Sequence, residues 1–167
     1  MTTNPLPLYL TWHAELRHMF ADLHKPQVRN LTWLLVGIFL SRSVHLNRIA
    51  NQIPGHARLV SITRRLSRFL DGPALAVRPS YEGFIRPLLV RLAQAGQVRL
   101  ILDTSKVGFH HQLLMVSVAY RRRAIPVAWT WLPCKKGHSS PTIQIALLRY
   151  ARSLLPARVV VDLVGDC

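Results

Sequence analysis

The stretch that decides the fold is Val98-Arg99-Leu100-Ile101-Leu102-Asp103, an apolar run that ends in a carboxylate. A second apolar run, Val159-Val160-Val161-Asp162-Leu163-Val164-Gly165-Asp166, ends in the same way. Runs of aliphatic and β-branched residues of this length are typical of buried strands. If these two strands are parallel neighbours, both terminal carboxylates emerge at the same edge of a sheet.

Three further elements are expected between these two runs. Gln112 to Tyr120 and Ile125 to Leu132 are rich in aliphatic, β-branched and aromatic residues, and Arg121-Arg122-Arg123-Ala124 joins them as a hairpin. Ser140 followed by Pro141 is a helix N-cap and first-turn pair that opens an amphipathic helix. The resulting order, β-β-β-α-β, resembles the start of a ribonuclease H-like fold, in which the first and fourth strands lie side by side.

The first half of the chain has a helical pattern instead. Apolar residues recur at spacings near 3.6 from Leu8 onward, and Pro26 interrupts them before a helix over Leu31 to Leu40. Two shorter helices, Ser43 to Asn51 and Ser61 to Leu70, follow at helix-turn-helix spacing, and a last helix ends at Gly96. We therefore expect an α+β protein with two domains: an all-α region, residues 1–96, and a region with the order β-β-β-α-β, residues 97–167.

The composition indicates a polyanionic partner. Among 167 residues, 22 are Lys or Arg and only 7 are Asp or Glu, which gives a formal net charge of +15. Such a surface favours nucleic acid as ligand. The longest uncharged apolar stretch, between Arg29 and Arg42, is shorter than the roughly 20 residues of a membrane-spanning helix. The N-terminus has no signal-peptide pattern. These features predict a cytoplasmic, nucleoid-associated protein without a membrane segment.

Three segments together resemble the IS-four-type DDE transposases of bacterial insertion sequences. They are Leu100-Ile101-Leu102-Asp103-Thr104-Ser105, the segment from Pro133 to Ser140, and Val161 to Asp166. The resemblance spans most of the chain. It implies that residues 1–96 are a DNA-binding region and that residues 97–167 are a partial ribonuclease H-like catalytic domain. It also implies Mg²⁺ as cofactor, transposon-end DNA as partner, and DNA cleavage and strand transfer as the activity of intact family members.

The resemblance assigns two catalytic and metal-binding residues. A strand ending in Asp-Thr or Asp-Gly-Thr supplies the first catalytic aspartate of the family, matched here by Asp103, and a later strand ending in Gly-Asp or Ala-Asp supplies the second, matched by Asp166. Carboxylate oxygens suit Mg²⁺. Alternatively, Asp103 starts an Asx turn and Asp166 is merely solvated. Asp162 is a reserve candidate, because a carboxylate inside an apolar strand must be paired or hydrogen-bonded.

Family members continue after the second aspartate to a helix that carries a catalytic glutamate. The only glutamates of this sequence, Glu15 and Glu82, both precede Asp103. We therefore expect a truncated transposase that is inactive alone but binds transposon ends, as a homodimer or as a heterodimer with intact transposase, and so interferes with it. The alternatives are a fragment that folds poorly and a basic RNA-binding protein.

Basic residues form two candidate DNA-binding groups. Arg64, Arg65 and Arg68 are related by steps of three and four residues, so they share one helix face and can follow a phosphate backbone. Lys135 and Lys136 precede a helix N-terminus, where phosphate binds readily. A solvated basic face and a flexible turn are the alternatives, and Cys134 with His138 lacks a four-ligand zinc motif. The full candidate set is Arg42, Arg48, Arg58, Arg64, Arg65, Arg68, Lys135 and Lys136.

Overall fold

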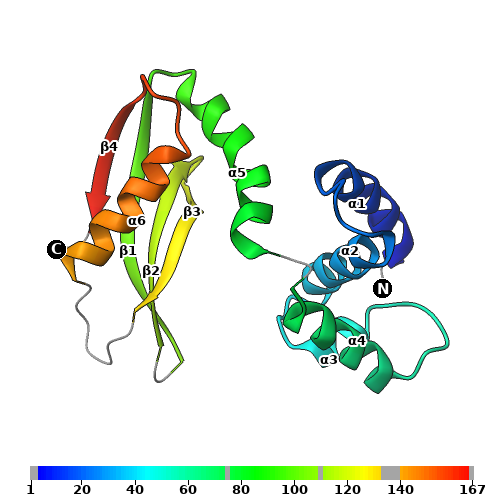
Figure 1. Ribbon diagram of the computed structural model, residues 1–167. Helices are drawn as coiled ribbons and strands as arrows, with labels where there is room; N and C mark the ends of the chain where they lie inside the picture. Colours follow the sequence, from blue (N-terminus) through cyan, green and yellow to red (C-terminus); the bar gives the residue numbers. More distant parts are fainter. Residues whose placement is uncertain (1–3, 74–75, 109–110, 133–139, 166–167) are drawn as a thin grey trace. The chain divides into compact units, whose positions relative to one another are not determined.

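A computed structural model describes residues 4–73, 76–108, 111–132 and 140–165 (Figure 1). These residues form six helices and one four-stranded mixed sheet, which confirms the α+β class. The chain makes two compact units, residues 1–81 and 82–167. Helix α5 (Val77–Ala93) spans the division between them, and the domain boundary expected at Gly96 lies just after its C-terminal end.

The first unit is helical, as the sequence predicted. It contains α1 (Pro5–Met19), α2 (Lys25–Ser41), α3 (Leu46–Ala50) and α4 (Leu59–Asp71). One core joins α2, α3 and α4. Its buried members are Leu31, Leu34, Ile49, Ala50, Ile62, Leu66 and Phe69.

The start of α2 corrects one expectation. The helix begins at Lys25 rather than Leu31, so Pro26 lies inside its first turn instead of separating two helices. The first helical N–H groups have no acceptor within the helix, and the φ of proline already suits a helix, so proline is favoured at this position. The backbone N–H of His24 donates to Gln27 Oε1 at 2.9 Å, which completes the turn.

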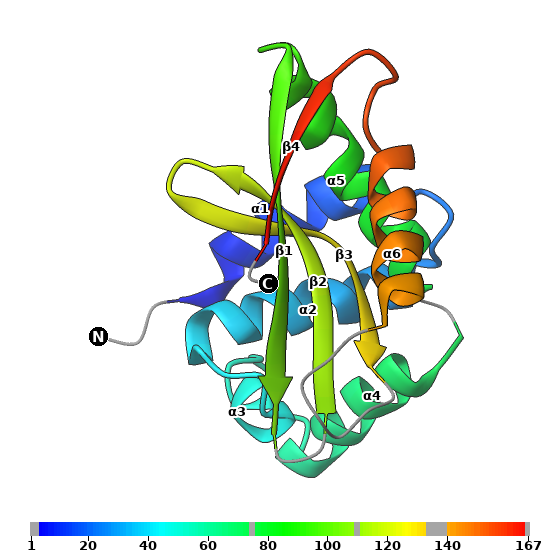
Figure 2. The same cartoon turned by 90° about the vertical axis from the view of Figure 1, so that its left-hand side faces the viewer.

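The second unit contains the sheet. Its strands are β1 (Gln97–Val107), β2 (His111–Tyr120), β3 (Arg123–Leu132) and β4 (Val160–Gly165), in the order β3-β2-β1-β4. Figure 2 shows the four strands side by side. β1, β2 and β3 are antiparallel neighbours, whereas β4 runs parallel to β1. A helix therefore precedes the one parallel strand, as the sequence order predicted.

Helix α6 (Pro141–Ser153) covers one face of this sheet and contacts β2 and β3. The Ser140 hydroxyl accepts from Ile143 N at 3.4 Å, and Pro141 occupies the first turn, so the predicted N-cap is confirmed. Val98 and Leu100 of β1, together with Val116 of β2, are buried among the apolar residues of this unit. Because strand side chains alternate between faces, Asp103 lies on the face opposite Val98 and Leu100.

Candidate nucleic-acid interface

The arginines of α4 line a pocket in the first unit. Helix α4 buries Ile62, Leu66 and Phe69, which have exposed fractions of 5%, 0% and 6%, so its opposite face is left for polar residues. The pocket has a volume of about 500 Å³. It is lined by Gln27, Asn30, Ser61, Arg64, Arg65, Arg68, Phe69 and Gly72.

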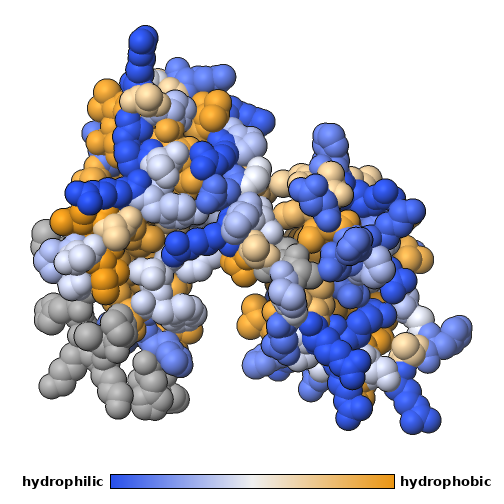
Figure 3. Space-filling view, in the orientation of Figure 1, coloured by the Kyte–Doolittle hydropathy of each residue, from blue (hydrophilic) through white to orange (hydrophobic). Residues whose placement is uncertain are grey.

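The pocket has the chemistry of an anion site. Three guanidinium groups line it, and none of the described residues lining it is acidic. Arg64 and Arg68 are exposed and Arg65 is half-buried. Guanidinium groups present fixed forks of N–H donors that match phosphate oxygens. Figure 3 shows hydrophilic residues over much of the visible surface of this unit.

Two residues that line this pocket each have a buried polar atom with unused hydrogen-bonding capacity. Arg65 Nε and Asn30 Oδ1 are buried and have no hydrogen-bond partner among the described residues. A buried polar atom left without a partner costs about 1–3 kcal/mol. Both residues line the pocket, so its wall is polar as well as cationic.

Gln27 and Asn30 are site residues that the sequence reasoning missed. They lie on α2, more than thirty positions before the arginines of α4. Only the packing of α2 against α4 brings the two sets together. No local spacing in the sequence distinguishes these two amides from other polar residues on a helix.

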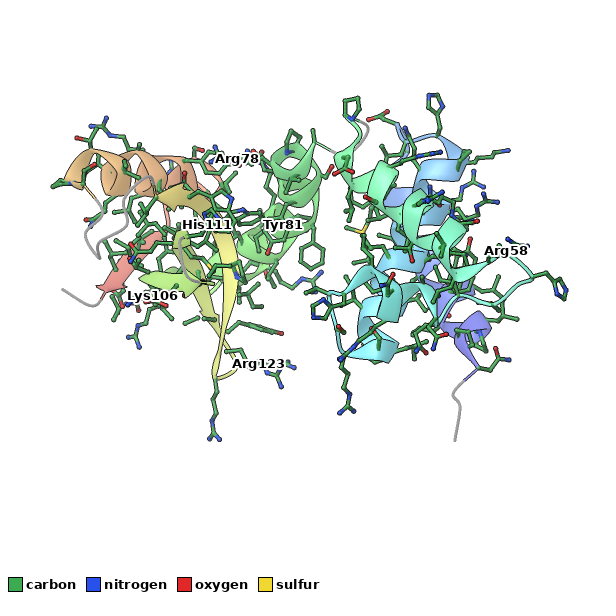
Figure 4. The ribbon with its side chains drawn as sticks, turned by 90° about the horizontal axis from the view of Figure 1, so that it is seen from below. Arg58, Arg78, Tyr81, Lys106, His111 and Arg123 are labelled. Carbon is green, nitrogen blue, oxygen red and sulfur yellow. The ribbon has the colours of Figure 1, made fainter. Side chains whose placement is uncertain are left out.

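The other predicted arginines of this unit lie elsewhere. Arg42 ends α2 in a left-handed conformation with φ of 49°, Arg48 lies in α3, and Arg58 is the N-cap residue of α4. All three are exposed, and none lines the pocket. Figure 4 labels Arg58 at the start of α4. Their contact with DNA stays a prediction, whereas Arg64, Arg65 and Arg68 are brought together.

Helices α3 and α4 do not form a standard helix-turn-helix. Eight residues, 51–58, separate Ala50 from Leu59, whereas the motif has a turn of about three or four residues. The pair is tied instead by Thr63 Oγ1, which donates to Asn47 Oδ1 at 3.1 Å. The helix-turn-helix spacing expected from the sequence is therefore wrong. The pocket between α2 and α4 is the feature of this unit that gathers cationic side chains.

Asp103 lies within β1 and not at its end. The sequence predicted a strand that stops at Asp103, but pairing with β2 continues through Asp103↔Met115 to Val107↔His111. The carboxylate is exposed. Its Oδ1 accepts from Thr104 N at 2.7 Å and its Oδ2 accepts from Ser105 Oγ at 3.4 Å. Each carboxylate oxygen keeps a lone pair for a further partner.

The parallel pairing of β1 and β4 brings together the residues that precede the two aspartates. The register ends at Leu102↔Gly165, directly before Asp103 and Asp166 in the sequence. A Cβ added at Gly165 would lie 3.3 Å from Leu102 O and 3.6 Å from Leu102 Cβ, so glycine permits this close approach. Asp166 itself lies outside the described residues.

Asp162 is occupied by neighbours on β1. Gln97 Nε2 donates to Asp162 Oδ2 at 2.6 Å, and Arg99 Nη2 lies 3.6 Å from the same oxygen. Because β1 and β4 are parallel with Arg99 opposite Asp162, these contacts fasten the start of the two strands. The carboxylate thus has the hydrogen-bonded environment that an apolar strand requires, and we assign it a structural role.

The predicted phosphate-binding loop before α6 falls in a segment that the structure does not describe. Lys135, Lys136, Cys134 and His138 lie outside the described residues. Among the residues that the structure does describe, no three His, Cys, Asp or Glu side chains gather as a metal site.

In the same part of the chain, no helix combines the length and apolar character needed to cross a membrane.

Comparison with models of known protein families, with curated proteins and with solved structures finds no match for this chain. The chain is an α+β protein with a cationic pocket on a helical unit and an exposed carboxylate on a mixed sheet.

Proposed function

We propose that this protein binds duplex DNA as a member of the DDE transposase type, with unit 1 holding the DNA backbone and the sheet carrying the aspartates of a metal-dependent site. One observation carries the proposal. β1 and β4 are parallel neighbours whose register ends at Leu102↔Gly165, and an aspartate directly follows each of these residues in the sequence.

The topology of the sheet supports a ribonuclease H-like interpretation. Three antiparallel strands are followed by α6 and then by β4, which adds parallel to β1 rather than to β3. Strands that follow one another in sequence are usually spatial neighbours, so the return of β4 to the first strand is a specific feature. It is the arrangement that would bring the carboxylates of the first and fourth strands together.

The donor chemistry of Asp103 fits a hard divalent cation. Its carboxylate is exposed, and its two local hydrogen bonds leave oxygen lone pairs unused. A bound Mg²⁺ would neutralise and polarise a phosphate. The two glutamates of this sequence, Glu15 and Glu82, precede Asp103 and match no third carboxylate of the family. We therefore expect this chain alone to bind DNA without cutting it.

The pocket of unit 1 supports backbone binding rather than base readout. Arg64, Arg65 and Arg68 supply charge to phosphates, and such contacts position a protein on DNA without reading its sequence. Each phosphate that is neutralised steepens the salt dependence of log K by about 0.9. Three contacts therefore contribute about 500-fold in affinity at 0.1 M salt relative to 1 M.

The test is a salt titration of binding to a fluorescent DNA duplex, read by anisotropy. It compares the unaltered chain with the variant Arg64→Ala/Arg65→Ala/Arg68→Ala. A matched control, Arg17→Ala/Arg91→Ala/Arg149→Ala, removes the same charge from exposed helix positions that are not among the lining residues of the pocket. An RNA hairpin of equal length is titrated in parallel.

The expected result is a salt slope that falls by about 2.7 in the α4 variant and by less than 1 in the control. Equal losses in the two variants would mean that net charge alone drives binding, which contradicts a site on α4. Tighter binding to the RNA hairpin than to the duplex would replace the proposal by RNA binding.

A further inference from the structure

The tip of the β2–β3 hairpin is made of arginine. Tyr120 pairs with Arg123, so Arg121 and Arg122 form a two-residue loop. Both loop residues have positive φ, 45° at Arg121 and 65° at Arg122. This is the backbone sign pattern of a type I′ turn, in which φ is positive at both central residues. Figure 4 labels Arg123 at the projecting end of this hairpin.

Arginine is a poor choice for this turn on stability grounds. The left-handed conformation crowds Cβ against the following carbonyl oxygen, and glycine and asparagine tolerate it best. Type I′ hairpins therefore strongly prefer Asn-Gly at the two loop positions. The chain places a long cationic side chain at each position instead. Residues held in a disfavoured backbone conformation are often found at functional sites, where they serve binding rather than stability.

The hairpin arginines are available for a ligand. Arg121, Arg122 and Arg123 are all exposed, and no carboxylate of the described residues forms an ion pair with them. The Arg121 guanidinium lies 5.3 Å from the centroid of the Tyr120 ring. A guanidinium over an aromatic face is held in place while its N–H groups, which lie in its own plane, stay free to donate.

We propose that Arg121, Arg122 and Arg123 form a second phosphate-binding site for duplex DNA, separate from the α4 pocket. A two-stranded ribbon fits a DNA groove, and the three guanidinium groups at its tip can grip the flanking phosphates as forks. The inference rests on the proposed function for the identity of the polyanion. It assigns to the hairpin a role that the fold does not require.

The hairpin tip lies at the end of β2, whereas Asp103 lies beside the middle of that strand. Asp103 pairs with Met115, and Arg121 follows Met115 by six residues. At about 3.4 Å per residue this is a separation of about 20 Å along the strand. A change at the tip therefore leaves the surroundings of Asp103 intact, and it removes charge without touching the buried residues of the sheet.

The experiment replaces the loop by its most favourable sequence, Arg121→Asn/Arg122→Gly. A second variant, Arg121→Lys/Arg122→Lys, keeps the charge but loses the forked donors. A control, Arg91→Gln/Arg149→Gln, removes two charges from exposed helix positions of the same unit. Each full-length variant is melted thermally and titrated with the same DNA duplex at several salt concentrations, alongside the α4 variant.

The expected result separates stability from binding. The Asn-Gly variant should melt at a higher temperature than the unaltered chain, yet bind DNA about 60-fold more weakly at 0.1 M salt, with a slope lower by about 1.8. The lysine variant should lose part of the affinity and the control little. Wild-type affinity in the Asn-Gly variant would overturn the inference, and so would an equal loss in the control.

The outcomes also distinguish this inference from the proposed function. If only the α4 variant lost affinity, the proposed DNA binding would stand and the hairpin site would be contradicted. If the unaltered chain did not bind the duplex, both the proposed function and the hairpin site would be contradicted. A lower melting temperature in the Asn-Gly variant would show that the arginines serve the fold, which contradicts the argument from the turn.

Discussion

The substitution Gly37→Ala should destabilise the helical unit, although alanine is the better helix former. Gly37 lies in α2 and faces Ile49 of α3. A Cβ there would lie 2.5 Å from Ile49 Cγ2 and 3.0 Å from the Ile49 carbonyl oxygen. Replacing glycine by alanine inside a helix gains about 1 kcal/mol from propensity. Overpacking a core costs about 1–3 kcal/mol.

The overpacking should outweigh the gain. Ile49 Cγ2 is attached to a β-branched carbon with restricted χ1, and Ile49 is 1% exposed, so the methyl group has little room to rotate away. The second contact is with backbone, which moves only if α3 moves. Taking the upper half of the overpacking range, we expect a net loss of about 1–2 kcal/mol in the free energy of unfolding.

The assay is urea denaturation with residue-resolved amide hydrogen exchange, which reads α2 separately from the second unit. Gly83→Ala in α5 is the matched control, because no atom lies within 4 Å of its added Cβ. It should gain about 1 kcal/mol. Ile49→Leu moves the branch away from Cβ and should rescue part of the loss in Gly37→Ala. A Gly37→Ala variant as stable as the unaltered chain would refute the close approach of α2 and α3.

Three further outcomes follow from single residues. Leu66→Ala, at a position with 0% exposure in the core, should lower the free energy of unfolding by about 2–5 kcal/mol in urea denaturation; a loss below about 1 kcal/mol would contradict its burial. Asp103→Asn should weaken Mn²⁺ binding measured by calorimetry without lowering the melting temperature, and unchanged Mn²⁺ affinity would remove Asp103 from the metal site. Burial raises the pKa of Tyr9 above its ordinary value of 10.0, an effect opposed by Arg29. The stabilisation from the neutral Tyr9 phenol is therefore fully present below pH 10.0 and is lost as pH rises through the folded-state pKa. Above pH 10, the melting temperature should fall less with pH in Tyr9→Phe than in the unaltered chain. Parallel declines of the two melting temperatures would contradict this assignment.

Elements defined by local pattern could be predicted from the sequence. Strands β2 and β3 and the capped helix from Ser140 lie where their hydrophobic periods and cap residues indicated. The inward face of α4 also follows from its 3.6-residue period, because Ile62, Leu66 and Phe69 recur on one side and are buried. In each case the signal and the structure involve neighbouring residues.

Features that depend on distant partners could not be predicted. β1 continues from Asp103 to Val107 through polar residues because β2 supplies backbone partners, which the composition of β1 does not indicate. Asn30 and Gln27 join the α4 arginines only after α2 has packed. The hairpin at Arg121 was expected from its flanking strands, but the left-handed turn was not, because the usual Asn-Gly signal is missing.

The placement of the arginines links the two proposed DNA contacts. With 22 basic and 7 acidic residues, most cations cannot be neutralised within the chain, and their mutual repulsion opposes folding. The α4 pocket and the hairpin tip lie on separate units of one chain. Two weak sites on one chain bind a long polyanion more tightly than either site alone, because the first contact raises the effective concentration of the second. A duplex that contacts both sites would therefore neutralise part of the charge that the fold leaves unpaired.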